Sequence, residues 1–183
     1  EQFEKLTASQ WSYIEAHCKQ ATLKRGTYFL KEGQVNRRLG FIVEGVCRYA
    51  CTDAAGNDVT QYFVKENQFL SAIESFNTQT PSDISIQAVT DTELVYIGYD
   101  DYQLLLAEVP MMEKLARQIV AFTFTEKMRN IAPMLQQDAR ARYEQFMRQQ
   151  PEVLQRVPLR YVASYLGITQ QSLSRLRKGV AVK

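Results

Sequence analysis

The pattern of apolar and polar positions changes twice along the chain. Between about residues 21 and 99, short apolar segments alternate with turn residues, and five of the eight glycines fall within residues 26–56. Short β-rich segments with regularly spaced turns are typical of a sandwich or barrel. The expected strands are 27–30, 40–43, 46–51, 59–64, 84–89 and 94–99. A capping-box pattern at 7–10 predicts one short helix before them.

Beyond Pro110 the apolar residues take helical spacing, and one long helix is expected from Met111 to about Ala132, with a kink or end at Pro133. Its apolar residues form two stripes, so this helix needs two surfaces to bury. One surface is the β-rich part, and the second fits a twin helix in a homodimer, because spacings of four and three are those of a coiled coil. The alternative is a single helix within one large core. The expected dimer contacts are Leu115, Ile119, Phe122, Met128 and Ile131.

Two shorter helices are expected around the stretch YLGITQQSLSRLRK (165–178). Apolar residues from Leu159 to Leu166 share one face of the first helix. Gly167 is suited to a left-handed C-cap, and Thr169 is suited to cap the second helix. The second helix turns its leucines inward and presents a polar, basic face that contains no acid. Two helices joined by a tight glycine turn form a helix-turn-helix pattern.

The outward residues of the second helix suit the chemistry of DNA. A glutamine amide can bond adenine, an arginine can hold guanine through two hydrogen bonds, and hydroxyls and lysine suit phosphates. The alternative is a solvated amphipathic helix without a partner. The expected DNA-binding residues are Thr169, Gln170, Gln171, Ser172, Ser174, Arg175, Arg177 and Lys178.

The net charge of +2 hides a separation of charge along the chain. Residues 136–183 carry nine Lys or Arg and three Asp or Glu, a balance of +6, so the other 135 residues sum to −4. A basic segment on an acidic body favours a polyanionic partner. Double-stranded DNA is therefore the expected partner of the C-terminal part.

Several other classes of protein are disfavoured. No apolar run approaches the roughly 18 residues of a membrane span, and no signal-peptide pattern is present, so we expect a cytoplasmic protein with no membrane partner. Cys18, Cys47 and Cys51 are too few for a four-iron cluster, and buried structural thiols are favoured over redox sensing. With His17 as the single histidine, and with no HExxH, Walker A or GxGxxG motif, no enzyme is expected. We therefore predict no catalytic site, no metal site and no cofactor.

Four segments give the chain a resemblance to the bacterial cyclic AMP receptor protein/Fnr (Crp/Fnr) family of transcription regulators. They are FLKEGQVNRRLGFIVEGVCRYA (29–50), VTQYFVKENQFL (59–70), TDTELVYIGYDDYQLLL (90–106) and VPLRYVASYLGITQQSLSRLRK (157–178). The resemblance covers nearly the whole chain and implies an α+β fold. Its parts would be an N-terminal jelly-roll (double-stranded β-helix) sensor domain of the cyclic-nucleotide-binding kind over 1–109, a long dimerisation helix over 110–135, and a helix-turn-helix domain over 136–183.

The resemblance also implies which residues read the bases. Gln170, Gln171 and Arg175 occupy the family's three base-contacting positions, where the best-known members carry Arg, Glu and Arg. Only the last is kept, so the operator should differ from theirs. The two glutamines favour an A/T-leaning half-site.

The family's ligand site is less well matched. Cyclic-nucleotide binders hold the ribose with a Gly-Glu pair and the phosphate with an Arg, and the aligned residues here are Ser71, Ala72 and Ser82. The family's Thr-Ser pair on the long helix is replaced by Glu-Lys-Met at 126–128. The ribose hydroxyl thus loses its acceptor, and a buried phosphate loses its counter-charge. We predict that cyclic AMP is not the effector, and that another small molecule fills the roll or the domain works without a ligand.

The combined expectation is a sequence-specific DNA-binding transcription regulator that acts as a homodimer. The dimer would place two recognition helices in successive major grooves. RNA polymerase and an unidentified small-molecule effector are further candidate partners. The alternative is a small-molecule-sensing regulatory module whose basic tail contacts a protein instead of DNA.

Overall fold

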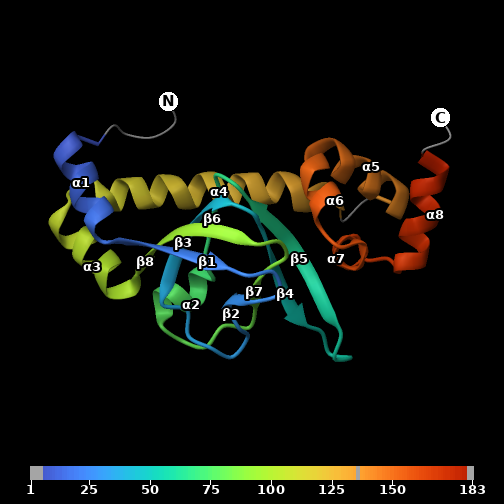
Figure 1. Ribbon diagram of the computed structural model, residues 1–183, viewed down its shortest axis with the longest axis horizontal. Helices are drawn as coiled ribbons and strands as arrows, with labels where there is room; N and C mark the ends of the chain where they lie inside the picture. Colours follow the sequence, from blue (N-terminus) through green and yellow to red (C-terminus); the bar gives the residue numbers. More distant parts are fainter. Residues whose placement is uncertain (1–5, 135–136, 181–183) are drawn as a thin grey trace.

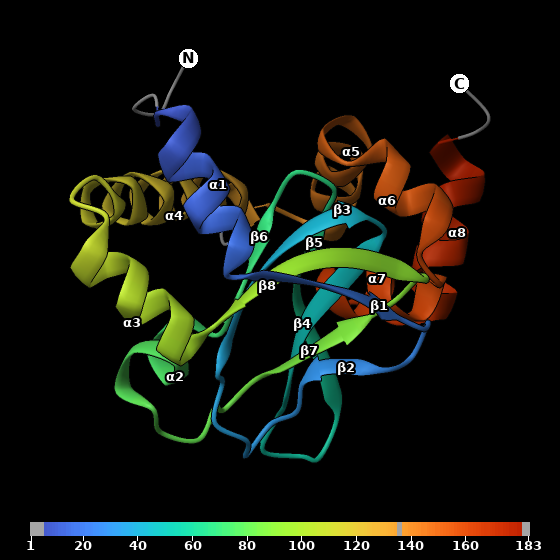
Figure 2. The same ribbon diagram turned by 60° about the vertical axis from the view of Figure 1, so that its left-hand side comes forward.

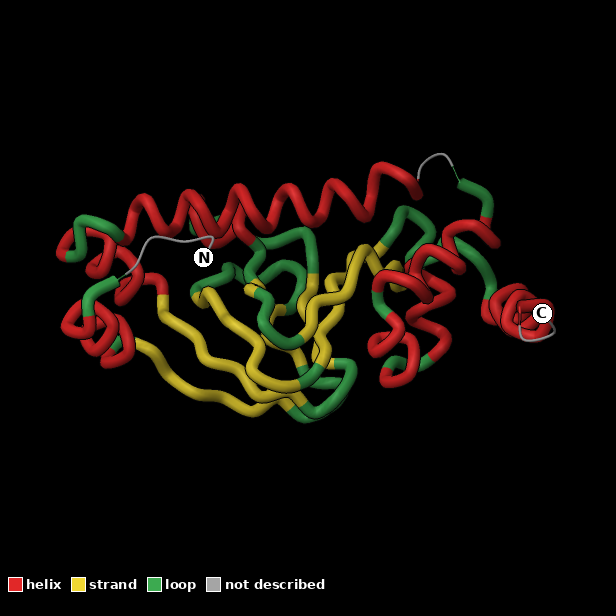
Figure 3. Tube along the Cα trace, turned by 90° about the horizontal axis from the view of Figure 1, so that it is seen from above, coloured by secondary structure: helices red, strands yellow, loops and turns green. Residues whose placement is uncertain are grey.

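The structure is a computed structural model that describes residues 6–134 and 137–180 (Figure 1). Two antiparallel sheets form a β roll, and the long helix α4 (Met112–Met134) lies along one side of it (Figures 1 and 3). The helices of residues 139–180 gather at one end of α4 (Figure 1). In the described part of the chain, no helix is long and apolar enough to cross a membrane.

The β roll consists of two four-stranded sheets whose strand pairs are all antiparallel (Figure 2). The order in the first sheet is β1 (Cys18–Leu23), β8 (Thr92–Gly98), β3 (Arg38–Glu44) and β6 (Phe69–Leu70). The order in the second sheet is β2 (Tyr28–Leu30), β7 (Ser85–Ala88), β4 (Val46–Thr52) and β5 (Asp58–Lys65). The predicted α+β class with a jelly-roll-like N-terminal part is confirmed.

The six predicted strands correspond to six of these eight strands. Strand β1 was not predicted, because its sequence CKQATL mixes polar and small residues without a regular alternation, and none of its residues is buried. Strand β6 has only two residues, which is too short for a periodic pattern. Both lie in the first sheet, where pairing with β8 and β3 holds them.

Alternate residues of the strands fill the inside of the roll, as the period of two requires. Cys47 and Tyr49 of β4 join Ile42, Leu70 and other buried residues in one core. Gly45 makes the tight connection from β3 to β4 with a φ of +113°. A Cβ at this glycine would lie 2.4 Å from the Thr92 hydroxyl oxygen, so a larger residue does not fit.

Three helices pack around the first sheet: α1 (Ala8–Ala16), α2 (Ile73–Thr78) and α3 (Tyr99–Glu108). The predicted capping box of α1 is present, with the Gln10 amide bonded to the Thr7 hydroxyl and the Gln10 side chain bonded to the Thr7 amide. Helix α3 and the start of α4 bury Leu105, Val109 and Met112 against Ile97 of β8. Helices α2 and α3 were not predicted. Helix α4 continues through Pro133 to Met134, after which residues 135–136 lie outside the described part.

The C-terminal helical unit consists of α5 (Ala139–Gln149), α6 (Pro151–Arg156), α7 (Leu159–Tyr165) and α8 (Gln170–Val180). Asp138 caps α5, because its carboxylate accepts the Ala141 amide hydrogen at 2.8 Å. The predicted turn between α7 and α8 is confirmed: Gly167 has a φ of +66°, and the Ser172 amide donates to the Thr169 hydroxyl at 3.1 Å. Helix α6 was not predicted, although Pro151 at its first position is a common start signal.

The predicted division at 109/110 and 135/136 stays a prediction, and residues 135–136 lie outside the described residues. One buried cluster, here called the shared core, nevertheless joins the β roll to the C-terminal helical unit. From the roll it takes Val46, Phe63 and Val89. From the helices it takes Tyr143, Phe146, Val153, Val157, Val162, Ala163, Leu166 and Leu173.

Arg48 of β4 lies beside the shared core, with only 3% of its side chain exposed. Its guanidinium donates to Asp58 at 2.9 Å, to Thr60 at 3.0 Å and to Gln87 at 2.8 and 2.9 Å. Its carbon Cζ lies 3.9 Å from the centre of the Tyr161 ring on α7. A buried charge without partners costs several kcal/mol. Strands β4, β5 and β7 and helix α7 therefore depend on one another through this side chain.

Candidate nucleic-acid interface and ligand site

Helix α8 presents most of the predicted recognition residues on one exposed face. On its other side Leu173 is fully buried and Leu176 is half-buried, and they fix the helix in the shared core. Ser172 is half-buried, and its hydroxyl bonds to the Thr169 hydroxyl at 3.0 Å, so these two residues also serve the N-cap. The exposed residues, here called the reading face, are Thr169, Gln170, Gln171, Ser174, Arg175, Arg177 and Lys178.

The basic side chains of the C-terminal helical unit fall into two groups. Arg140 pairs with Glu144 at 2.9 Å within α5, and Arg156 pairs with Glu66 of the roll at 2.8 Å. These two arginines support the fold. In the described part of the chain, by contrast, no hydrogen bond or ion pair engages Arg175, Arg177 or Lys178. Their charge is available to a partner of α8.

A further arginine, Arg142 of α5, lies behind the turn between α7 and α8. Its Nη2 is 3.9 Å from where a Cβ of Gly167 would lie, and its Nη1 donates to the Gln137 carbonyl at 3.4 Å. Its Nε is buried and has no hydrogen-bond partner among the described residues. Sequence reasoning did not single out Arg142, because an arginine on an amphipathic helix carries no special signal.

Ser71, Ala72 and Ser82, the residues aligned with the expected ligand site, are all buried. The Ser71 hydroxyl accepts from the Asn36 amide at 2.7 Å and donates to the Arg38 carbonyl at 3.2 Å. The Ser82 hydroxyl donates to the Ile84 carbonyl at 2.9 Å and accepts the Ile84 amide hydrogen at 3.2 Å. Both hydroxyls therefore hold the loops of the roll together, and neither carries charge.

A lysine of α4 reaches the roll beside these residues. The Lys127 ammonium donates to the Tyr62 hydroxyl at 2.8 Å and lies 4.2 Å and 5.1 Å from the ring centres of Tyr62 and Tyr49. The two rings stack at 4.1 Å, and the Tyr49 hydroxyl accepts the Ser71 amide hydrogen at 2.7 Å. The chain's own side chains thus connect α4, the inside of the roll and the aligned ligand residues.

Burial controls the ionisation of this group of side chains. It lowers the pKa of the Lys127 ammonium to about 8, because two aromatic rings replace water around the charge. It also raises the pKa of both Tyr49 and Tyr62, so these phenols stay neutral. Lys127 is the cation of this site, and no carboxylate among the described residues pairs with it.

Helix α4 has one apolar side that packs on the roll and one that is exposed. The expected dimer contacts are divided between these sides and stay a prediction. Leu115 is half-buried against the cluster of α3 and β8, and Ile119 is also half-buried. Four other apolar residues are exposed: Val120 at 50%, Phe122 at 44%, Phe124 at 62% and Met128 at 41%. Val120, Phe124 and Met128 follow one another at steps of four and form a single stripe, here called the α4 stripe. The side chain of Ile131 lies outside the described residues.

Comparison with known proteins places this geometry in a family. The model of the cyclic nucleotide-binding domain matches residues 20–109. Residues 20–109 belong to the cyclic nucleotide-binding domain family. No curated protein sequence matches the chain.

Solved structures extend the likeness beyond the cyclic nucleotide-binding domain. The c-di-GMP-responsive regulator CLP of Xanthomonas campestris has 16% identity and a TM-score of 0.75 over 96% of this chain and 92% of its own. A protein assigned to the Crp/Fnr regulators from Eubacterium rectale has the same identity and TM-score over 97% and 84%. The catabolite activator protein of Thermus thermophilus has 18% identity and a TM-score of 0.60 over 98% and 86%. The whole chain therefore has the fold of the Crp/Fnr transcription regulators.

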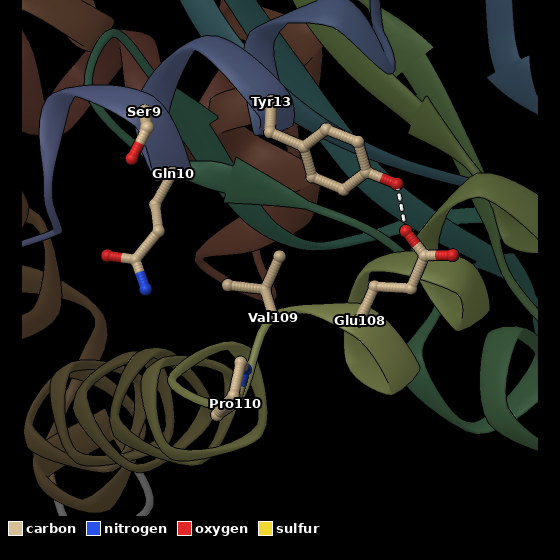
Figure 4. A pocket seen from close by; sticks show the side chains of 6 residues that line it. All are labelled: Ser9, Gln10, Tyr13, Glu108, Val109 and Pro110. Carbon is tan, nitrogen blue, oxygen red and sulfur yellow. Dashed lines mark hydrogen bonds between the residues drawn. The ribbon is translucent and has the colours of Figure 1, made fainter.

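A shallow pocket of about 180 Å³ lies at the other end of the molecule from α8 (Figures 1 and 4). Tyr13 of α1 donates a hydrogen bond across it to the Glu108 carboxylate at the end of α3. The lining residues are Ser9, Gln10, Tyr13, Glu108, Val109 and Pro110. Most of the lining comes from α1 and from the α3–α4 connection, at the margin of the cyclic nucleotide-binding domain.

Of the three cysteines, Cys47 is buried, as expected of a structural thiol, whereas Cys18 and Cys51 are half-buried. Burial raises the pKa of the Cys47 thiol to about 12, so this thiol stays protonated inside the cyclic nucleotide-binding domain. The His17 Nδ1 donates a hydrogen bond to the Tyr13 carbonyl at 2.8 Å, and the imidazole packs edge-on against the Tyr13 ring. The described residues contain no group of three or more side chains that could hold a metal ion.

Replacing Lys127 by Met should change how stability depends on pH. In the folded protein the Lys127 pKa is about 8, against 10.5 for a free lysine, so from pH 8 to 10.5 the unfolded chain binds more protons. The free energy of unfolding of the wild type should therefore rise across this window relative to Lys127→Met, by about 1–3 kcal/mol. Urea denaturation at several pH values measures it. Lys31→Met, at an exposed lysine, serves as the control, and parallel curves for wild type and Lys127→Met would contradict the assignment.

Proposed function

We propose that this chain is a sequence-specific DNA-binding transcription regulator of the Crp/Fnr type that acts as a homodimer. The observation that carries the proposal is the division of α8 into a buried and an open side. Leu173 anchors the helix in the shared core, whereas Arg175, Arg177 and Lys178 stay exposed without partners among the described residues. A rigid helix that offers amides and unpaired cations, with no acid, suits the major groove of DNA.

The chemistry of the reading face supports a defined operator. Gln170, Gln171 and Arg175 lie within the first two turns of α8, the part of a recognition helix that contacts base edges. Their amides and guanidinium favour adenine and guanine, respectively. We expect half-sites that lean toward A/T, with guanine opposite Arg175.

The α4 stripe supports the homodimer. Three large apolar residues at steps of four, exposed by 41–62% of their surface, are costly to leave in water. A second copy of the same helix, packed along this stripe, would bury them. In such a dimer the two reading faces would meet successive major grooves about 34 Å apart.

The inside of the roll supports an effector other than cyclic AMP, or none. Cyclic-nucleotide binders hold the ribose with an acid and the phosphate with a cation, and none of Ser71, Ala72 and Ser82 supplies either group. The two serine hydroxyls are already bonded within the roll. Lys127 is engaged by Tyr49 and Tyr62.

We infer that the protein works in the cytoplasm on DNA and catalyses no reaction. RNA polymerase is a candidate partner at the promoter.

The second candidate function is a regulatory module whose basic helices contact an acidic protein. The same unpaired cations favour it, because they suit any polyanion. Salt dependence separates the two, since DNA binding releases counterions and weakens steeply as salt rises. Absence of binding to any duplex at low salt would favour the module.

Substituting Arg175 by Ala should weaken binding to a selected operator by about 1–3 kcal/mol, because one bidentate contact to guanine is lost. Specificity at that base pair should relax in a selection from random duplexes. Fluorescence anisotropy with the operator and with random DNA measures both effects. Arg37→Ala removes a charge on the roll that is 63% exposed, and should leave operator affinity unchanged. Equal affinity of Arg175→Ala and wild type would show that α8 does not read the site.

Substituting Phe124 by Asp should convert the dimer to a monomer, because a carboxylate on each copy would be buried against the other. Sedimentation velocity at micromolar concentration measures the change in mass. Leu104→Asp alters a residue of α3 that is 40% exposed and outside the α4 stripe, and this variant should remain dimeric. A Phe124→Asp protein that sediments as a dimer would place the dimer interface elsewhere.

Adding cyclic AMP should change operator affinity by less than about twofold, because the residues that hold its ribose and phosphate are replaced. A titration of cyclic AMP in the anisotropy assay measures this, and calorimetry without DNA checks direct binding. A tenfold gain in operator affinity would show that the roll has found another way to bind the nucleotide.

A further inference from the structure

Two neighbouring residues of opposite charge at the end of β5 face two residues of opposite charge on α6. Lys65 forms an ion pair with Glu152, and Glu66 forms an ion pair with Arg156 at 2.8 Å. A second hydrogen bond joins Arg156 to Glu66 at 3.1 Å, and the Gly45 amide also donates to Glu66 at 2.7 Å. The hydrogen bond from Arg156 lowers the pKa of the Glu66 carboxyl to about 2. Along the chain, the two charges on the roll are positive and then negative, and the two charges that pair with them on α6 are negative and then positive.

Helix α7 covers the free edge of β5, which is the last strand of its sheet. The Thr60 amide donates to the Ser164 hydroxyl at 2.9 Å, and that hydroxyl lies 3.3 Å from the Asp58 carbonyl that accepts from it. An exposed strand edge would otherwise leave such backbone groups to water or to another strand. One serine of α7 therefore continues the hydrogen bonding of the sheet into the helical unit.

Aromatic side chains also pack where the strands of the roll meet the C-terminal helices. The Tyr161 ring lies between two guanidinium groups, with Arg48 at 3.9 Å and Arg160 at 4.7 Å from its centre. Phe63 of β5 packs against Tyr165 at 5.6 Å and Phe146 at 6.1 Å between ring centres. Most of these contacts belong to the interior of the molecule, so the junction is packed in the manner of a domain core.

We propose that this junction is a latch that holds the DNA-binding helices on the roll in their reading orientation without any bound effector. The latch consists of Lys65, Glu66, Glu152 and Arg156, together with the Arg48–Tyr161 and Thr60–Ser164 contacts. The inference rests on the proposed DNA-binding function and goes beyond it, because it assigns how the reading orientation is set.

The position of the latch indicates that it supports DNA binding rather than opposes it. Its residues lie on β4, β5, α6 and α7, except Glu66, which directly follows β5, and none lies on α8. The latch does not switch DNA binding off by covering the reading face, because all seven residues of that face stay exposed. Only the present alignment pairs opposite charges, because exchanging the two partners on α6 would bring like charges together.

A fixed orientation has a measurable consequence in a dimer. Two half-sites bind together only when both reading faces have the required separation, and the gain in affinity depends on the effective concentration of the second face. With the latch closed, the protein should prefer one half-site spacing sharply. With the latch open, each helical unit should still bind a half-site, but the preference for spacing should flatten.

The test reverses the charges without changing the net charge. One variant carries Lys65→Glu with Glu66→Lys, a second carries Glu152→Lys with Arg156→Glu, and a third combines all four changes. Each of the first two should lose at least about tenfold in affinity for the optimally spaced palindrome, while affinity for a single half-site stays within about twofold of wild type. The combined variant restores complementary pairs and should recover the palindrome affinity.

The matched control is Arg140→Glu with Glu144→Arg, which reverses an ion pair inside α5 and should leave the spacing preference intact. Hydrogen exchange at the Thr60 amide gives a readout without DNA: exchange should quicken in the first two variants and slow again in the combined one. Unchanged spacing preference, or unchanged exchange at Thr60, in the first two variants would overturn the latch. Wild-type protein that binds no duplex, with exchange responding as expected, would overturn DNA binding but keep the latch.

Discussion

The burial of Arg48 is the constraint on which the junction of sheet and helices depends. A guanidinium with 3% of its side chain exposed is tolerable only because Asp58, Thr60 and Gln87 saturate its donors and Tyr161 covers its face. Removing any one of these partners leaves the buried Arg48 guanidinium without part of its compensation. The second sheet therefore completes its hydrogen bonding only when α7 is in place, and the shared core continues this dependence from Phe63 to Leu173.

A second cation, the half-buried Lys127, is held by different contacts. Tyrosine rings and one phenol hydroxyl, rather than a carboxylate, receive its ammonium, and its lowered pKa records the incomplete compensation. This side chain connects the long helix to the inside of the roll, where Tyr49 bonds to Ser71, one of the residues aligned with the expected ligand site. The Lys127 contacts inside the roll and the packing of the helical unit on the roll agree with the proposed account, in which intramolecular contacts take the place of a ligand.

Sequence reasoning found the parts whose cause is local. Gly167, Thr169 and the leucines of 159–176 predicted the turn and the buried side of α8, because caps and periodicity act over a few residues. The strands with alternating apolar residues were found for the same reason. The missed features depend on contacts far apart in the chain: β1 needs β8, Arg48 needs Tyr161, and Lys65 needs Glu152, 87 positions away. A lysine within an apolar helical segment, as at 127, is the one signal that could have been noticed.

The central claim is that an effector-free dimer already holds its two reading faces at the separation that DNA requires. The most direct measurement is the distance between spin labels at Gln149→Cys in the two protomers, in a protein whose native cysteines are replaced. Gln149 is exposed at the end of α5 and lies outside the reading face and the latch. A single narrow distance distribution, unchanged when operator DNA is added, is the predicted result. A broad distribution that narrows only with DNA or a small molecule would contradict the claim.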